Sequence, residues 1–162
     1  MVLVSGLGIS GIINAADSLG TNAQNHASLT ELSRADDYVI RGNHYFENGE
    51  WQKAIDNFDK AILLEPTNPS FYEYRGGAYF LNGQFDDAIS DYSTQIRLDP
   101  TNETPYLNRA TVYRARNEWN KAMADFNECL RLNSNNASAY KGYAAVHDAK
   151  GQYGQAIKAF SI

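Results

Sequence analysis

The sequence predicts an all-α repeat protein in which antiparallel pairs of helices stack one after another. Two observations lead to this prediction. From Ala35 onwards, a pattern of aromatic, small and proline residues recurs every 34 residues, and self-similarity at such a period indicates a repeat architecture. Within each copy, a glycine or an asparagine separates two stretches that are each long enough to form a helix.

The first two copies align without insertion or deletion when Pro66 is matched with Pro100. The third copy carries Ser134 at the proline position, and the fourth is shortened. Small residues in the pattern would let paired helices approach closely, and large aromatic residues would fill the space between them. In the first copy the repeated positions are Tyr38, Arg41, Gly42, Tyr45, Gly49, Trp51, Ala54, Phe58 and Pro66.

This pattern resembles the tetratricopeptide repeat, which has tryptophan, glycine and tyrosine on its first helix, then alanine, phenylalanine and proline. The resemblance covers residues 35–162. It implies an α-α superhelix, or solenoid, with three full repeats (35–68, 69–102 and 103–136) and a partial fourth (137–162). Residues 1–34 would then form an apolar N-terminal segment and a polar linker. The resemblance also implies a non-enzymatic scaffold or adaptor that binds other proteins.

The predicted helix pairs are residues 36–48 with 51–64, 70–82 with 85–98, 104–116 with 119–132, and 138–150 with a helix from Tyr153 onward. Capping boxes begin at Ser28 and at Ser33; the second fits the repeat register, and the first would extend the helix backwards. The first helix of each pair is expected to stop at a residue that tolerates the left-handed backbone region. These residues are Gly49, Gly83, Asn117 and Gly151.

One pair of repeat positions changes together between the copies. Arg75 and Arg109 are each followed sixteen residues later by an aspartate, Asp91 and Asp125. Arg41 is followed by Asn57, and in the fourth copy the two positions hold Tyr143 and Ala159. We therefore predict a bridge between the paired helices of repeats two and three, weaker in repeat one and absent in repeat four.

The composition narrows the class of function. A net charge of -5 and scattered lysines and arginines disfavour nucleic-acid binding, which needs a positive surface. The single cysteine, Cys129, excludes an intramolecular disulfide and is expected to be a buried, unreactive thiol. His26, His44 and His147 form no catalytic pattern, and no phosphate loop or metal-ligand spacing is present. We expect no enzyme activity and no cofactor.

The N-terminal region differs from the repeats. Residues 1–13 are apolar and uncharged but too short to span a membrane as a helix. They resemble the core of a secretory signal followed by small residues at 14–16, although the basic start is missing. This favours export, for example to a periplasm. The alternatives are a cytoplasmic protein with a disordered extension, or a chain start placed downstream of the true one. Residues 17–26 are predicted to be a linker.

The family resemblance also implies which residues bind a partner, because the first helices of successive repeats line a concave groove. These positions differ between copies, as selective recognition of a peptide or helix requires. Phe46 and Phe80 are the expected anchors, because buried aromatic residues tend to dominate such interfaces. The implied groove residues are Val39, Asn43, Phe46, Glu73, Tyr74, Gly77, Phe80, Leu107, Asn108, Thr111, Arg114, Lys141, Ala145 and Asp148.

One group of partners can be tested against the sequence. Co-chaperones of this family grip the acidic C-terminal tail of heat-shock chaperones with lysine and asparagine, then asparagine, then lysine and arginine. Asn43 stands at its place in this set, whereas Val39, Tyr74, Thr104 and Asn108 stand at the other four. We therefore expect no carboxylate-clamp chaperone binding. The apolar and amide lining suits a partly hydrophobic peptide or helix.

An alternative function is structural self-assembly. Ile157 and Phe160 belong to the last predicted helix, and no later helix in the sequence would cover them. Terminal repeats normally present a polar outer face, so this end could join a second copy into a homo-oligomer. The same observation would also fit a piece of a longer repeat array.

Overall fold

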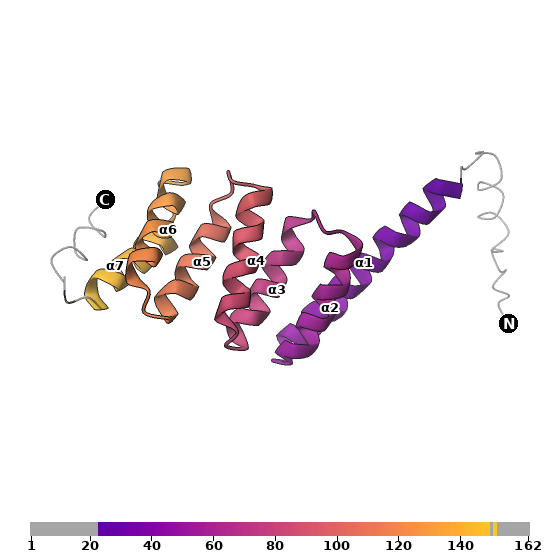
Figure 1. Cartoon of the computed structure of the whole chain (residues 1–162), viewed down its shortest axis with the longest axis horizontal. Helices are drawn as coiled ribbons and strands as arrows, with labels where there is room; N and C mark the ends of the chain where they lie inside the picture. The colour runs from indigo at the N-terminus through magenta and orange to yellow at the C-terminus, as the bar shows by residue number, and fades with distance from the viewer. Residues whose placement is uncertain (1–22, 150, 152–162) are drawn as a thin grey trace, which may run out of the picture.

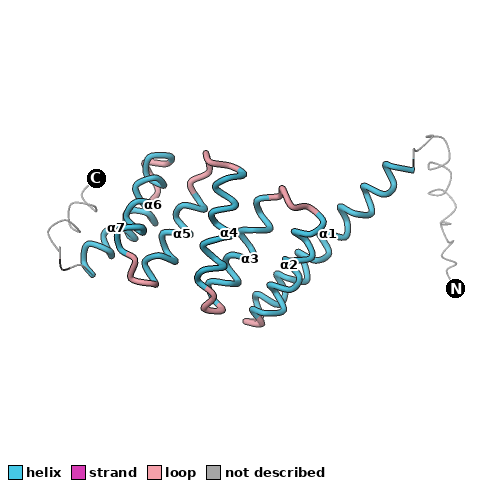
Figure 2. The backbone as a smooth tube through the Cα atoms, in the orientation of Figure 1, coloured by secondary structure: helices cyan, strands magenta, loops and turns pink. Residues whose placement is uncertain are grey.

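The structure is a computed structural model that describes residues 23–149 and residue 151, with side chains described from residue 34. All regular structure in this part of the chain is α-helical (Figures 1 and 2). The helices are α1 (Ala23–Glu47), α2 (Trp51–Leu64), α3 (Pro69–Leu81), α4 (Phe85–Leu98), α5 (Thr104–Ala115), α6 (Trp119–Leu132) and α7 (Ala137–Ala149). Figure 1 shows them side by side in one elongated row, which confirms the predicted all-α solenoid.

Each repeat folds into a hairpin of two helices, α1 with α2, α3 with α4 and α5 with α6. Four residues lie in the left-handed backbone region at the predicted turns, with φ of 75° at Gly49, 78° at Gly83, 60° at Asn117 and 71° at Gly151. The second helices begin as predicted, at Trp51, Phe85 and Trp119. They also end as predicted, at Leu64, Leu98 and Leu132. The first helices end one residue earlier than predicted, at Glu47, Leu81, Ala115 and Ala149.

The core repeats along the array in separate clusters between neighbouring helices. Ala54, Ala88 and Ala122 are completely buried, as their repeat position predicts. Phe58 and Phe126 fill the space beside them and are almost completely buried. Because each cluster joins only neighbouring elements, the stability of the array is a sum of repeat and interface contributions.

Helix α1 corrects one prediction. It begins at Ala23 and not near Asp36, so residues 23–26 of the predicted linker and both predicted capping boxes lie within the helix. Between Ala23 and Arg41 the chain contains no glycine or proline, and alanine, leucine, glutamine and glutamate favour helix. A continuous helix is therefore compatible with this stretch, and α1 extends beyond the rest of the array (Figure 1).

Several predictions concern residues outside the described range. The signal-like residues 1–13 belong to this group, and so does the predicted linker up to residue 22. The predicted helix from Tyr153 onward also lies outside it, with Ile157 and Phe160. Among the described helices, none is both long enough and apolar enough to cross a membrane.

Candidate binding groove

Two arginines hold the first helices of repeats two and three in place. Arg75 donates from Nε and Nη2 to the carboxylate of Asp91, at 2.8 and 2.6 Å. Arg109 donates in the same way to Asp125, at 2.8 Å for both bonds. The bridge predicted from the paired changes between copies is therefore confirmed in these two repeats.

Each of these arginines also reaches backwards into the preceding repeat, which the sequence did not predict. Nη1 of Arg75 donates to Asp59 on α2 at 2.6 Å, and Nη1 of Arg109 donates to Ser93 on α4 at 2.9 Å. Each guanidinium thus joins three consecutive helices. This arrangement fixes the first helices, whose exposed faces form the groove, relative to the second helices behind them.

Repeat one lacks this arrangement. Arg41 donates to the backbone oxygen of Asp37, and Asn57 donates to that of Lys53, so each side chain bonds within its own helix. In repeat four, the ring of Tyr143 packs on His147 with centroids 4.8 Å apart, and Ala159 lies outside the described residues. The weaker bridge predicted for repeat one is therefore not formed between these two described side chains.

A first hollow of about 300 Å³ lies on the side of the array formed by α1, α3 and α5. It brings together six of the predicted groove residues, from three repeats. Aromatic rings from the second helices form its floor. The lining residues are Asn43, Phe46, Phe58, Glu73, Tyr74, Gly77, Tyr92 and Asn108.

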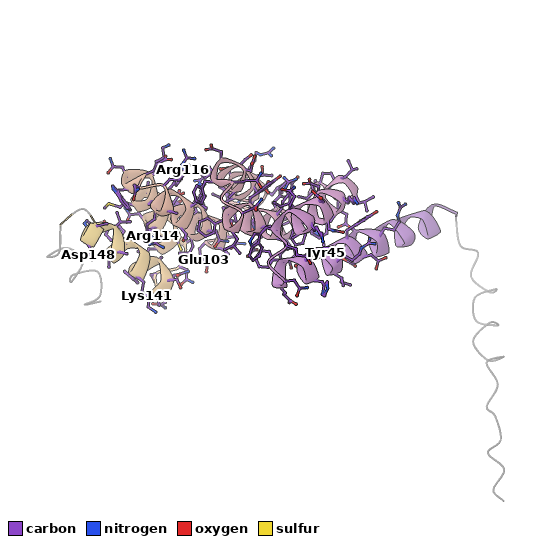
Figure 3. All side chains as sticks on the ribbon, turned by 90° about the horizontal axis from the view of Figure 1, so that it is seen from below. Tyr45, Glu103, Arg114, Arg116, Lys141 and Asp148 are labelled. Atoms are coloured by element: carbon purple, nitrogen blue, oxygen red, sulfur yellow. The ribbon has the colours of Figure 1, made fainter. Side chains whose placement is uncertain are left out.

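A second hollow of about 330 Å³ lies beside the first, between α5 and α7. Asn108 lines both hollows, so they form one groove along the repeats. Figure 3 labels Arg114 and Lys141 toward the C-terminal end of the described array. The lining residues of this hollow are Leu107, Asn108, Thr111, Arg114, Phe126, Ser138, Lys141, Gly142 and Ala145.

The floor of the groove was missed from the sequence. Phe58, Tyr92 and Phe126 occupy one repeat position, which the repeat pattern assigns to the core, yet all three also line a hollow. One residue of the next repeat along the chain decides how the ring of Phe58 or of Phe126 is covered. The ring of Tyr74 packs on Phe58 with centroids 5.7 Å apart, whereas at the same repeat position a Cβ on Gly142 would overlap the ring of Phe126.

Three of the predicted groove residues, Val39, Phe80 and Asp148, line neither hollow. Val39 packs against the buried cluster that contains Ala61 and Phe71. Phe80 packs on Phe85 with ring centroids 5.9 Å apart. Both side chains are half-buried. Their role as groove residues stays a prediction, while Phe46 faces the first hollow and also packs edge-on against Trp51.

The groove and the core behind it contain a few polar groups whose contacts are defined. Glu73 accepts a hydrogen bond from Nε2 of Gln95 at 3.3 Å, and burial raises the pKa of the Tyr92 phenol. Cys129 is completely buried, and burial raises the pKa of its thiol to about 11, which agrees with the predicted unreactive cysteine. Within the described residues, no group of three or more histidine, cysteine or carboxylate side chains is placed to hold a metal ion.

Family models and solved structures identify the repeat. A TPR repeat model matches residues 42–83 and 76–114, and a tetratricopeptide repeat model matches residues 107–162. A search of curated proteins found no match.

Solved structures with similar folds include the first TPR of Spaghetti (RPAP3) bound to the HSP90 peptide SRMEEVD. It is 28% identical, covers 74% of this chain and 94% of its own, and has a TM-score of 0.69. The first TPR domain of human RPAP3 is 27% identical over 75% of this chain and 96% of its own, with a TM-score of 0.69. MamA is 21% identical over 84% of this chain and 80% of its own, with a TM-score of 0.73. The chain belongs to the tetratricopeptide repeat family.

Proposed function

We propose that the protein is a non-enzymatic scaffold that holds an extended segment of a partner protein in the groove formed by α1, α3, α5 and α7. The first hollow carries this proposal. Its floor is aromatic, and the ring of Tyr74 remains 38% exposed although it lies on Phe58. An apolar side chain that entered this hollow would remove aromatic surface from water, at about 25 cal/mol per Å².

The same hollow offers hydrogen bonds to a peptide backbone. Asn43 and Asn108 stand on either side of α3, on α1 and α5, and both are only half-buried. In the described part of the chain, neither side-chain amide makes a hydrogen bond. An asparagine amide both donates and accepts, so these two residues suit the alternating N–H and C=O groups of an extended segment.

A related structure supports a peptide as the ligand, because the first TPR of Spaghetti (RPAP3) is bound to an HSP90 peptide. The chemistry of the groove differs from that expected for an acidic C-terminal tail. Val39, Tyr74 and Thr104 replace three of the polar or cationic residues of the carboxylate clamp. We therefore propose an internal segment with an apolar anchor as the ligand.

Selection of random peptides displayed on phage, with the whole chain as bait, tests this function. Synthetic copies of enriched peptides are then titrated against wild type, Gly77→Leu and Ala124→Leu by fluorescence polarisation. A Cβ on Gly77 would lie 3.7 Å from Phe46, an ordinary contact, so leucine fills the first hollow without an immediate clash. Ala124 is exposed on α6, lines neither hollow and receives the same added side chain.

We expect enrichment of peptides with an apolar residue, loss of binding in Gly77→Leu, and unchanged binding in Ala124→Leu. Circular dichroism checks whether both variants remain helical. Failure to enrich any peptide would contradict the proposed function. Equal affinity of Gly77→Leu and wild type would place the binding surface elsewhere.

A further inference from the structure

The two hollows of the groove carry opposite charge. Glu73 is the only charged residue in the lining of the first hollow. Arg114 and Lys141 are the only charged residues in the lining of the second. The second hollow is therefore a doubly positive site on a chain whose net charge is -5.

Arg114 and Lys141 have no partner within the described chain. Both are exposed, and neither makes a hydrogen bond or an ion pair there. By contrast, six other arginines and lysines of the repeats are in salt bridges. These are Lys53, Arg75, Arg109, Arg116, Lys121 and Arg131.

Packing of the repeat does not require these two cations. The position of Arg114 is occupied by Phe46 and Phe80 in the earlier repeats, and that of Lys141 by Val39, Glu73 and Leu107. Asp148 is exposed on α7 but is not in the lining of the second hollow. The positive charge therefore remains available to a ligand.

We propose that the bound segment carries an aspartate or glutamate whose carboxylate pairs with both Arg114 and Lys141. This inference rests on the proposed function and specifies the chemistry of its partner. The two cations stand on different helices, α5 and α7, so one carboxylate between them would bridge repeats three and four. Leu107 and Phe126 provide apolar lining beside the pair, so the acidic residue would lie next to an apolar surface.

The positions of the hollows also set the spacing within the segment. The first hollow is centred on α3 and the second lies between α5 and α7, roughly one and a half helix spacings away. An extended chain advances about 3.3 Å per residue, so the acidic residue lies several residues from the apolar anchor.

The phage selection distinguishes this inference from the proposed function when it is repeated on a charge-reversed protein. The test variant carries Arg114→Glu with Lys141→Glu. The matched control carries Arg34→Glu with Arg97→Glu, since both arginines are exposed, make no bond in the described chain and line neither hollow. Both variants change the net charge equally, so a general electrostatic effect would appear in both.

We expect wild type and the control to enrich an acidic residue at one position, and the test variant to enrich lysine or arginine there. A selected peptide should bind the test variant about tenfold more weakly or worse. Its glutamate-to-glutamine analogue should bind wild type more weakly, a measurement that needs no change in the protein. Added salt should weaken wild-type binding.

Two results would overturn the inference while leaving the proposed function intact. These are enriched apolar peptides without an acidic preference, and an acidic preference that persists in the charge-reversed variant. Enrichment of no peptide at all would overturn both.

Discussion

Arg75 and Asp91 form a two-pronged ion pair between the helices of the second repeat, with N···O distances of 2.8 and 2.6 Å. The side chain of Asp91 is 5% exposed and that of Arg75 is 19% exposed. Burial raises the pKa of the Asp91 carboxyl, and the hydrogen bonds from Arg75 oppose that rise. The carboxylate thus depends on the guanidinium to remain charged inside the protein.

We expect this pair to show strong coupling in a double-mutant cycle. Arg75→Ala should lower the free energy of unfolding by about 3 kcal/mol, because it leaves a buried carboxylate without its partner. The coupling energy with Asp91→Ala should be about 1–3 kcal/mol in urea denaturation. The matched control is the pair of Arg116 and Asp86, in which Asp86 is 90% exposed, and its coupling should be much smaller. Simple additivity at Arg75 and Asp91 would show that the bridge contributes nothing.

The sequence predicted one half of this arrangement and missed the other half for a physical reason. Arginine and aspartate changed together between copies, so the bridge within a repeat was visible. The backward bond goes to Asp59 in one repeat and to Ser93 in the next. Either residue can accept a hydrogen bond, so no paired change revealed the contact.

The helix boundaries and the groove were also only partly predictable from the sequence. Glycine and asparagine in the left-handed region predicted the turns, because few other residues adopt that backbone conformation cheaply. The start of α1 was not predicted, because a stretch without glycine or proline has no sharp local boundary. Phe58 and Tyr92 were assigned to the core alone. A repeat pattern indicates that one side of a ring is buried, but it does not show that another side of the ring lines a hollow.

Cys129 should make the stability of the protein depend on alkaline pH. Burial raises the pKa of its thiol from the ordinary 9.0 to about 11. Between these values the unfolded chain loses the thiol proton and the folded chain keeps it, so the contribution present below pH 9 is lost as pH rises towards 11. The loss amounts to roughly 3 kcal/mol, since each tenfold difference in proton affinity is about 1.4 kcal/mol.

Urea denaturation of wild type and Cys129→Ala at several pH values measures this contribution. The position equivalent to Cys129 in repeat one is Ala61, so the alanine variant should fold. The stability advantage of wild type over the variant should shrink from pH 9 to pH 11. A thiol reagent should label the folded protein only as fast as it opens. A constant difference between the two proteins across this range would contradict the raised pKa.

The turn at Gly83 isolates the cost of the left-handed conformation. Its φ is 78°, and a Cβ placed there would meet no atom within 4 Å. Gly83→Ala should therefore lose about 1 kcal/mol of stability through backbone strain alone. Gly83→Asn should lose less, because Asn117 adopts the same conformation at the equivalent turn of repeat three. Thermal unfolding of the three proteins checks this order, and equal stability of the alanine and asparagine variants would contradict it.

Gly142 and Gly77 provide a matched pair of helix glycines in the groove. Both lie inside helices, so replacement by alanine should gain about 0.5–1 kcal/mol from the restricted unfolded chain if space allows. Space allows it at Gly77, where the nearest atom is 3.7 Å away, but at Gly142 the new methyl group would overlap the buried ring of Phe126.

Gly77→Ala should thus raise the midpoint of urea unfolding, and Gly142→Ala should lower stability by about 1–3 kcal/mol. Phe126→Leu should restore part of the lost stability when combined with Gly142→Ala, because leucine is smaller than phenylalanine and leaves room for the new methyl group. If both alanine variants were stabilised equally, Phe126 would not pack against the backbone of α7. The second hollow would then have a different floor, because its depth depends on the close approach of this ring to a residue without a side chain.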